Sequence, residues 1–190
     1  MKRLVILASG SGSNAENIIR HFQNHSSICV DSVISNRKDA FVLERAKKLN
    51  IPQQYFPKNA FIKDDLVLNY LIENADYVIL AGFLLKIPEN VVKAFPNKII
   101  NIHPALLPKF GGKGMYGMNV HKAVKEQGET ETGITIHFVN ENYDEGATIF
   151  QASTPVLKTD TPDDIAANIH TLEQNHFPQV LEETILNALS

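Results

Sequence analysis

Asn101 and His103 are the side chains whose types and spacing most clearly suggest chemistry. They lie two residues apart at the end of an apolar run, I-I-N-I-H-P at residues 99–104, which has the pattern of a buried strand. Residues two apart in a strand point to the same face. An amide and an imidazole placed together at a strand's carboxyl end suit oxyanion stabilisation and proton transfer, as acyl transfer requires. On these residues alone, a structural, hydrogen-bonded histidine is the alternative.

Asp144 is the carboxylate that we expect to serve this pair. It lies in N-Y-D-E-G at residues 142–146, a predicted turn between two extended runs. A carboxylate folded against an imidazole favours its charged form. Contact between Asp144 and His103 is therefore a prediction for the structure to test.

A second segment with chemical potential is the loop G-S-G-S-N-A at residues 10–15, between an apolar run and a helical pattern. Its backbone amides and the positive end of the helix dipole favour an anion. The loop loosely matches the dinucleotide fingerprint G-x-G-x-x-G/A, but Ser35, Asn36 and Arg37 stand where a nicotinamide-binding unit needs an acid. It also lacks the P-loop lysine and the esterase pattern G-x-S-x-G. The loop thus predicts a phosphate monoester site, with a plain strand-to-helix turn as the alternative.

The elements that must position these residues alternate along the chain. Buried strands are predicted at residues 4–8, 28–34, 77–80 and 99–102, an extended segment at 52–56, helices at 14–22, 40–49 and 61–73, and an antiparallel pair at 132–139 and 147–156. This order predicts a single α/β domain over residues 1–190. Its sheet should be open, doubly wound and mixed but mostly parallel, with helices on both faces and ligands at the strands' carboxyl ends.

The last predicted helix begins at T-P-D-D, residues 161–164, where a capping hydroxyl, a first-turn proline and two acids suit a helix start. Pro178 is expected to kink or interrupt this helix before it resumes over residues 180–189. Glu173 lies close to that expected break.

Composition excludes several classes of function. The chain is 44% hydrophobic and 21% charged with a net charge of −3, which is typical of a soluble globular protein and argues against nucleic-acid binding. No apolar run approaches the roughly 20 residues that cross a bilayer, and the N-terminus does not resemble a signal peptide, so we expect a cytoplasmic protein. With one cysteine, Cys29, and no zinc motif, no metal is expected. The expected partners are small molecules, and the expected state is a monomer or a weak homodimer.

Three segments together resemble the phosphoribosylglycinamide formyltransferases: N-I-H-P-A-L-L-P at residues 101–108, G-S-G-S-N at 10–14 and L-A-G-F at 80–83. The resemblance spans nearly the whole chain. The first segment is shared with methionyl-tRNA formyltransferases and formyltetrahydrofolate hydrolases, so it specifies the chemistry more than the acceptor. The glycine-rich loop resembles the ribonucleotide phosphate site of the purine enzymes.

The resemblance implies a formyltransferase fold and transfer of a formyl group from the co-substrate 10-formyltetrahydrofolate to the amine of glycinamide ribonucleotide, in purine biosynthesis. It implies that Asn101 and His103 stabilise the oxyanion while Asp144 holds His103 charged, and that Glu173 contacts the acceptor ribose. The implied phosphate ligands are Ser11, Gly12, Ser13 and Asn14. The implied folate site comprises Leu84, Leu85, Lys86, Ile87, Asn101, Asn140, Glu141, Asn142, Tyr143 and Asp144.

Four features depart from the family pattern. Some relatives use a basic residue near position 64 to meet the folate glutamate, and Lys63 is the nearest cation here. Leu85 stands where relatives often carry Arg, Glu145 replaces a common glycine, and the loop at residues 109–118 is longer than usual. The rival functions are a formyltetrahydrofolate hydrolase, another formyl-folate-dependent transferase, and a nucleotide-binding module that uses the glycine-rich loop alone. Hydrolases add an N-terminal domain and methionyl-tRNA formyltransferases add a C-terminal one, and we expect neither here.

Overall fold

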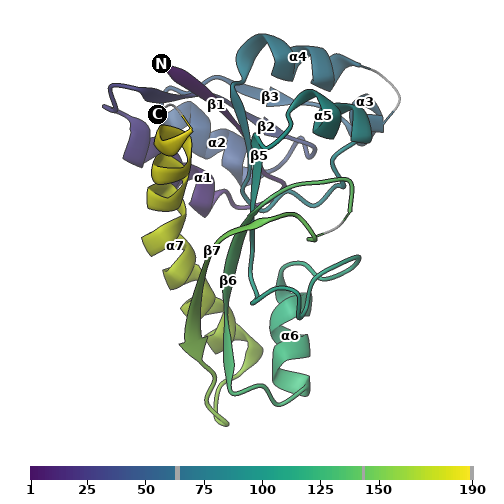
Figure 1. Ribbon diagram of the computed structural model, residues 1–190, viewed down its shortest axis with the longest axis vertical. Helices are drawn as coiled ribbons and strands as arrows, with labels where there is room; N and C mark the ends of the chain where they lie inside the picture. Colours follow the sequence, from purple (N-terminus) through teal and green to yellow (C-terminus); the bar gives the residue numbers. More distant parts are fainter. Residues whose placement is uncertain (63–64, 143, 189–190) are drawn as a thin grey trace. The chain divides into compact units, whose positions relative to one another are not determined.

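The computed structural model describes residues 1–62, 65–142 and 144–188. It divides into two compact units, Met1–Asn101 (the N-terminal unit) and Ile102–Ser190 (the C-terminal unit). Within these residues, seven strands, whose bounds are given next, form one sheet in the order β3-β2-β1-β4-β5-β6-β7 (Figure 1). In chain order the elements are β1 (Lys2–Leu7), α1 (Ser13–Phe22), β2 (Ile28–Ser35), α2 (Phe41–Lys48), β3 (Gln53–Tyr55), α3 (Lys58–Ile62), α4 (Leu66–Asn74), β4 (Tyr77–Leu80), α5 (Glu89–Ala94), β5 (Ile99–His103), α6 (Met118–Glu126), β6 (Glu131–Phe138), β7 (Thr148–Pro155) and α7 (Pro162–Asn187).

Strand β1 forms the centre of the N-terminal unit. It pairs in parallel with β2 on one side and β4 on the other, and its residues 4–7 are fully buried. A strand covered on both faces has no polar side to present, which explains its uninterrupted apolar run. The further parallel pairs are β2 with β3 and β4 with β5.

The order of these strands fixes where the helices go. From β1 the chain steps to β2 and β3 in one direction, and then places β4 and β5 on the opposite side of β1. Because crossovers between parallel strands are right-handed, the helices before and after this reversal cover opposite faces. Helices α1 and α2 contact each other and β2, whereas α4 contacts α3, α5 and β1 (Figure 1). The predicted doubly wound fold is confirmed, and its switch point lies between β1 and β4.

The C-terminal unit is built on the antiparallel pair β6 and β7, paired from Glu131 with Pro155 to His137 with Thr148. Helix α7 contacts both strands and α6, and Figure 1 shows it running along the pair. A capping box starts α7 as predicted: Thr161 Oγ1 accepts from Asp164 N at 3.2 Å, and the Asp164 carboxylate accepts from Thr161 N at 2.8 Å.

Helix α7 differs from the prediction that Pro178 interrupts it. It is continuous from Pro162 to Asn187 with Pro178 inside it, so the expected interruption is wrong. A proline inside a helix costs about 3 kcal/mol, while each fully buried large apolar side chain contributes roughly 1.5–3 kcal/mol. Phe177, Leu181 and Ile185 flank the proline at 0% exposure, and their burial outweighs that cost.

The other predicted elements form with small changes at their ends. The helix expected over residues 61–73 is instead two helices, α3 and α4, and residues 63–64 between them lie outside the described residues. Among the helices that the structure describes, none combines the length and apolarity needed to span a membrane.

Candidate active site

The glycine-rich loop after β1 opens α1 in the N-terminal unit. Gly12 is the N-cap of the helix, with φ of 78°, and no side chain caps the first turn. Ser11 is exposed and Ser13 and Asn14 are half-buried. The loop therefore lies at the positive end of the α1 dipole, which is the geometry expected of an anion site.

Ser9 ties this loop to the ends of two neighbouring strands. Its hydroxyl donates to Asn36 Oδ1 at 2.6 Å and accepts from Leu84 N at 2.9 Å, while its own N–H donates to the Gly82 carbonyl at 3.0 Å. Asn36 occupies the position where a dinucleotide-binding protein would carry an acid, and here it holds Ser9. The loops after β1, β2 and β4 are thus fixed to one another at the carboxyl edge of the sheet.

The predicted folate segment, residues 84–87, follows the same edge. Leu84 is 46% exposed and Lys86 is exposed, whereas Ile87 is 5% exposed and anchors the segment in the core. Leu85 is half-buried. The segment presents alternate side chains outward, and Ser9 holds its first amide.

His103 ends β5 and belongs to the C-terminal unit. It is 4% exposed, and its Nε2 lies 2.7 Å from the Phe110 carbonyl oxygen. A carbonyl only accepts, so Nε2 carries the proton and donates to it. This bond leaves Nδ1 as the ring atom with free hydrogen-bonding capacity.

Asp144 lies between two buried histidines. Its Oδ2 is 3.7 Å from His103 Nδ1, and its Oδ1 is 3.8 Å from His137 Nε2. Oδ2 also accepts from Gly112 N at 2.8 Å, which fixes the carboxylate. The predicted neighbourhood of His103 and Asp144 is confirmed, at a distance that gives attraction without a direct hydrogen bond.

His137 is the residue of this cluster that sequence reasoning missed. It is 2% exposed, and its Nδ1 lies 2.8 Å from the Phe138 carbonyl oxygen. Burial lowers the pKa of His137 below 6.5, against the smaller raising effects of the Phe138 hydrogen bond and Asp144. The sequence offered one signal, the two-residue spacing that places Thr135 and His137 on the same face of β6. In the structure, Thr135 Oγ1 donates to Ala105 O and accepts from Leu107 N, in the segment after His103.

The turn after β6 holds three further predicted residues. Asn140 is half-buried and its Oδ1 accepts from Asn142 N at 2.9 Å, while Glu141 and Asn142 are exposed. Tyr143 lies outside the described residues. Glu145, the departure beside Asp144, is exposed, so its carboxylate is solvated.

Glu173 lies on α7 with its side chain only 15% exposed. His170 Nδ1 is 3.7 Å from Glu173 Oε2, and Glu173 is the main cause that raises the pKa of His170 above 6.5. Burial lowers the pKa of His121 on α6, and Glu173 and His103 both act on His121 electrostatically. The C-terminal unit therefore gathers charged and titratable groups around Glu173 as well as around Asp144.

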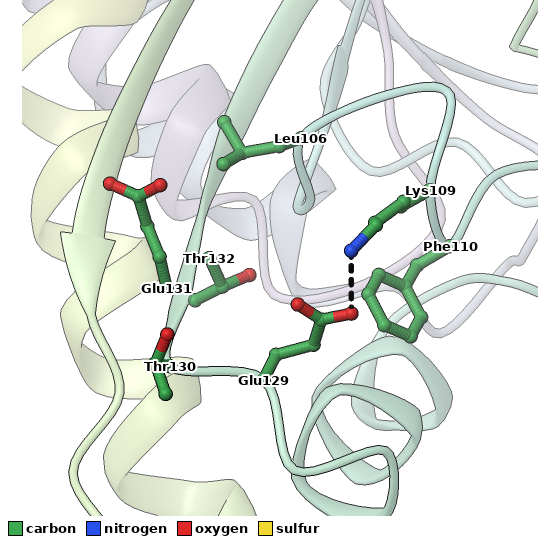
Figure 2. Close-up of a pocket in the computed structure, with 7 residues that line it drawn as sticks. All are labelled: Leu106, Lys109, Phe110, Glu129, Thr130, Glu131 and Thr132. Atoms are coloured by element: carbon green, nitrogen blue, oxygen red, sulfur yellow. Dashed lines mark hydrogen bonds and ion pairs between the residues drawn. The ribbon is translucent and has the colours of Figure 1, made fainter.

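A cavity of about 290 Å³ lies next to the Phe110 loop in the C-terminal unit (Figure 2). Two of the residues that line it form a hydrogen bond, in which Lys109 Nζ donates to Glu129 Oε1 at 2.8 Å. The cavity is lined by Leu106, Lys109, Phe110, Glu129, Thr130, Glu131 and Thr132. None of these is a predicted substrate residue, so we assign the cavity to neither substrate.

No group of three or more histidine, cysteine, aspartate or glutamate side chains in the described part of the chain is arranged to hold a metal ion. A histidine with one nitrogen committed, one nitrogen free and a carboxylate 3.7 Å away can accept a proton and then donate it to an oxyanion.

Comparison with known proteins decides the family. Residues 2–181 match the formyl transferase family model. The phosphoribosylglycinamide formyltransferase of Haemophilus influenzae is 36% identical over 188 residues, which cover 96% of this chain and 86% of its own length. This chain belongs to the phosphoribosylglycinamide formyltransferase family.

Two further relatives agree. A chloroplastic phosphoribosylglycinamide formyltransferase of Arabidopsis thaliana is 42% identical over 188 residues, or 95% of this chain, and this chain spans only 64% of that relative's length. The crystal structure of phosphoribosylglycinamide formyltransferase from Bacillus halodurans is 30% identical, with a TM-score of 0.88 over 98% of this chain and 97% of the other. The formyltransferase fold is therefore confirmed.

In this member of the family, the structure groups the predicted residues by unit. The N-terminal unit carries the phosphate loop, residues 84–87 and Asn101, and the C-terminal unit carries His103, residues 140–142, Asp144 and Glu173. Asn101 and His103 share one face of β5, as their spacing predicted. The roles of these residues toward substrates remain predictions.

Proposed function

We propose that this protein transfers the formyl group of 10-formyltetrahydrofolate to the amine of glycinamide ribonucleotide, in purine biosynthesis. The observation that carries the proposal is the buried His103, which is held by the Phe110 carbonyl and faces Asp144 in a chain of this family. A hydrolase needs the same formyl chemistry, and the phosphate loop at Gly12 supports a phosphorylated acceptor instead of water.

In the proposed reaction the acceptor amine attacks the formyl carbon. A C–N bond forms to the acceptor, the carbonyl oxygen becomes an oxyanion, and the bond from the formyl carbon to N10 of the folate then breaks. One proton leaves the amine and one reaches N10, so the reaction is balanced. His103 Nδ1 is suited to take the amine proton and, once charged, to stabilise the oxyanion together with the Asn101 amide. Asp144 stabilises the imidazolium by attraction across 3.7 Å.

The substrates are assigned to segments in the same proposal. Ser11, Gly12, Ser13 and Asn14 bind the acceptor phosphate, and Glu173 binds the ribose hydroxyls. The folate site comprises Asn101, Asp144 and residues 84–87 and 140–143. We further propose that the protein acts in the cytoplasm as a single domain, as a monomer or weak homodimer, without a metal and without nucleic-acid partners.

The test is the absorbance change from 10-formyltetrahydrofolate to tetrahydrofolate, followed with and without glycinamide ribonucleotide, with the product mass determined in parallel. We expect turnover only when the ribonucleotide is present, with a product heavier by one formyl group in place of a hydrogen. Turnover without the acceptor would identify a hydrolase. No turnover under either condition would leave a nucleotide-binding module.

A further inference from the structure

Helix α2 holds two successive carbonyl groups of the glycine-rich loop. Val42 N donates to the Gly10 carbonyl at 3.1 Å, and Arg45 Nε donates to the Ser11 carbonyl at 2.8 Å. In a trans peptide the C=O and the following N–H point in opposite directions. Fixing the two carbonyls toward α2 therefore aims the N–H groups of Ser11 and Gly12 away from α2.

Arg45 also balances a charge that would oppose an anion at this loop. Glu16 lies in the first turn of α1, and its carboxylate forms ion pairs with Arg20 and Arg45. These guanidinium groups hold the pKa of Glu16 below 4.5, and the hydrogen bond from Arg20 is the largest single cause. A bare carboxylate beside the loop would repel a phosphate dianion. Because Glu16 is paired with both arginines, it stays paired when either one is replaced.

Of the two arginines, Arg45 is the more fixed. Its guanidinium lies 5.0 Å from the centre of the Phe41 ring, a cation–π distance, and its side chain is 30% exposed. Arg20 is 58% exposed, and it bonds to Glu16 on its own helix. The two residues thus share the charge, while the bond to the loop belongs to Arg45.

We propose that Arg45 is a positioning residue for the acceptor's phosphate. It aims the Gly12 amide through the Ser11 carbonyl, without contact with the substrate itself. The inference rests on the proposed function, because it assigns to that loop the phosphate of the acceptor.

The test compares Arg45→Gln with Arg20→Gln, which removes the same unit of charge and leaves the loop bond intact. Each is assayed with glycinamide ribonucleotide and with the same acceptor lacking its phosphate. Arg45→Gln removes the hydrogen bond from the guanidinium to the Ser11 carbonyl. We therefore expect it to lower kcat/KM for the phosphorylated acceptor about tenfold. For the dephosphorylated acceptor, and for Arg20→Gln with either acceptor, we expect less than about a twofold change, as for exposed ion pairs. Equal losses on both acceptors, or equal effects of the two variants, would overturn the inference.

A second measurement does not depend on turnover. Inorganic phosphate is titrated into the full-length ¹⁵N-labelled protein while the amide resonances of Ser11 and Gly12 are followed by NMR. The concentration dependence of these shifts gives the affinity for phosphate. We expect Arg45→Gln to lower that affinity about tenfold, and Arg20→Gln to change it by less than about twofold. The spectra also report whether each variant is folded. If the unsubstituted protein bound phosphate but did not catalyse formyl transfer, the proposed function would fail, and this titration would still test Arg45. If both variants bound phosphate with the same affinity, the role of Arg45 would be refuted and the proposed function would be unaffected.

Discussion

At the scale of residues, the geometry around His103 separates its two nitrogens by task. The bond from Nε2 to the Phe110 carbonyl fixes the ring and its tautomer, while Nδ1 faces Asp144 without a direct hydrogen bond. Asp144 is itself fixed by Gly112 N. The carboxylate can thus stabilise a positive imidazole electrostatically and leave Nδ1 free to exchange a proton with substrate.

This separation predicts the effect of Asp144→Asn. Asparagine tolerates the φ of 54° at this position and can still accept from Gly112 N, so the shape is kept and the charge is lost. Since general acid–base groups contribute about a hundredfold or more, we expect kcat to fall by about that factor with little change in either KM. The control is Glu145→Gln, an exposed carboxylate one residue away, which should retain the full rate. Steady-state kinetics of both variants measure this, and an Asp144→Asn enzyme with more than half of the kcat would contradict it.

The residues of the cluster differ in how far the sequence reveals them. His103 and Asp144 were predictable, because one ends an apolar strand beside Asn101 and the other lies in a polar turn. His137 was not, because an inward histidine on an alternating strand has the same pattern as a hydrogen-bonded core residue. The Phe110 carbonyl and Gly112 amide carry no side-chain signature, and only the folded loop reveals them.

At the scale of elements, the glycine-rich loop depends on how closely α2 approaches α1. Gly12 has φ of 78°, and a Cβ added there would lie 2.3 Å from Val42 Cγ2 and 2.7 Å from Val42 Cα. A side chain at Gly12 would therefore strain the backbone and push α2 away from the loop. Gly10, two residues earlier, has no atom within 4 Å of a built Cβ.

The matched pair Gly12→Ala and Gly10→Ala tests this dependence. A left-handed conformation costs an alanine about 1–2 kcal/mol, and overpacking adds about 1–3 kcal/mol. Gly12→Ala should therefore lower the free energy of unfolding by about 2–5 kcal/mol, whereas Gly10→Ala should change it by less than about 0.5 kcal/mol. Urea denaturation measures both, and indistinguishable midpoints would show that α2 does not constrain the loop.

Elements were predictable where local physics decides them. The uninterrupted apolar run of β1 and the capping box at Thr161 follow from short-range rules, and both formed as expected. Pro178 shows the limit, because its effect on α7 depends on burial supplied by the rest of the C-terminal unit. The start of a separate helix, α4, at Leu66 also left no clear signal in an apolar periodicity that runs through residues 61–73.

At the scale of the whole molecule, the alternation of strands and helices predicted the doubly wound sheet, because right-handed crossovers leave few other arrangements. The division into two compact units was not predictable, since no linker or change of composition marks residue 101. The proposed activity depends on a folded chain, so the stability of the fold matters. The pKa shifts in the C-terminal unit make that stability depend on pH.

His121 and His137 are 5% and 2% exposed, and burial lowers the pKa of each below 6.5. A histidine with a lowered folded pKa stabilises the protein above its unfolded pKa, and that stability is lost as pH falls from about 6.5 toward the folded pKa. His170 acts in the opposite sense, because its pKa is raised, but at 49% exposure its effect is screened and smaller. We therefore expect the free energy of unfolding to fall between pH 7.5 and 5.5.

Urea denaturation at several pH values in this window checks the expectation, and it stays above the range where Glu16 titrates. Coincident transitions by circular dichroism and tyrosine fluorescence are expected of one cooperative domain. The double variant His121→Asn, His137→Asn removes both groups that must stay neutral, so its stability should vary less with pH than that of the unsubstituted protein. The comparison uses the slope with pH instead of the absolute stability, so a general loss of packing in the variant does not affect it. An equal slope in the two proteins would mean that other groups, and not these buried histidines, link folding to pH.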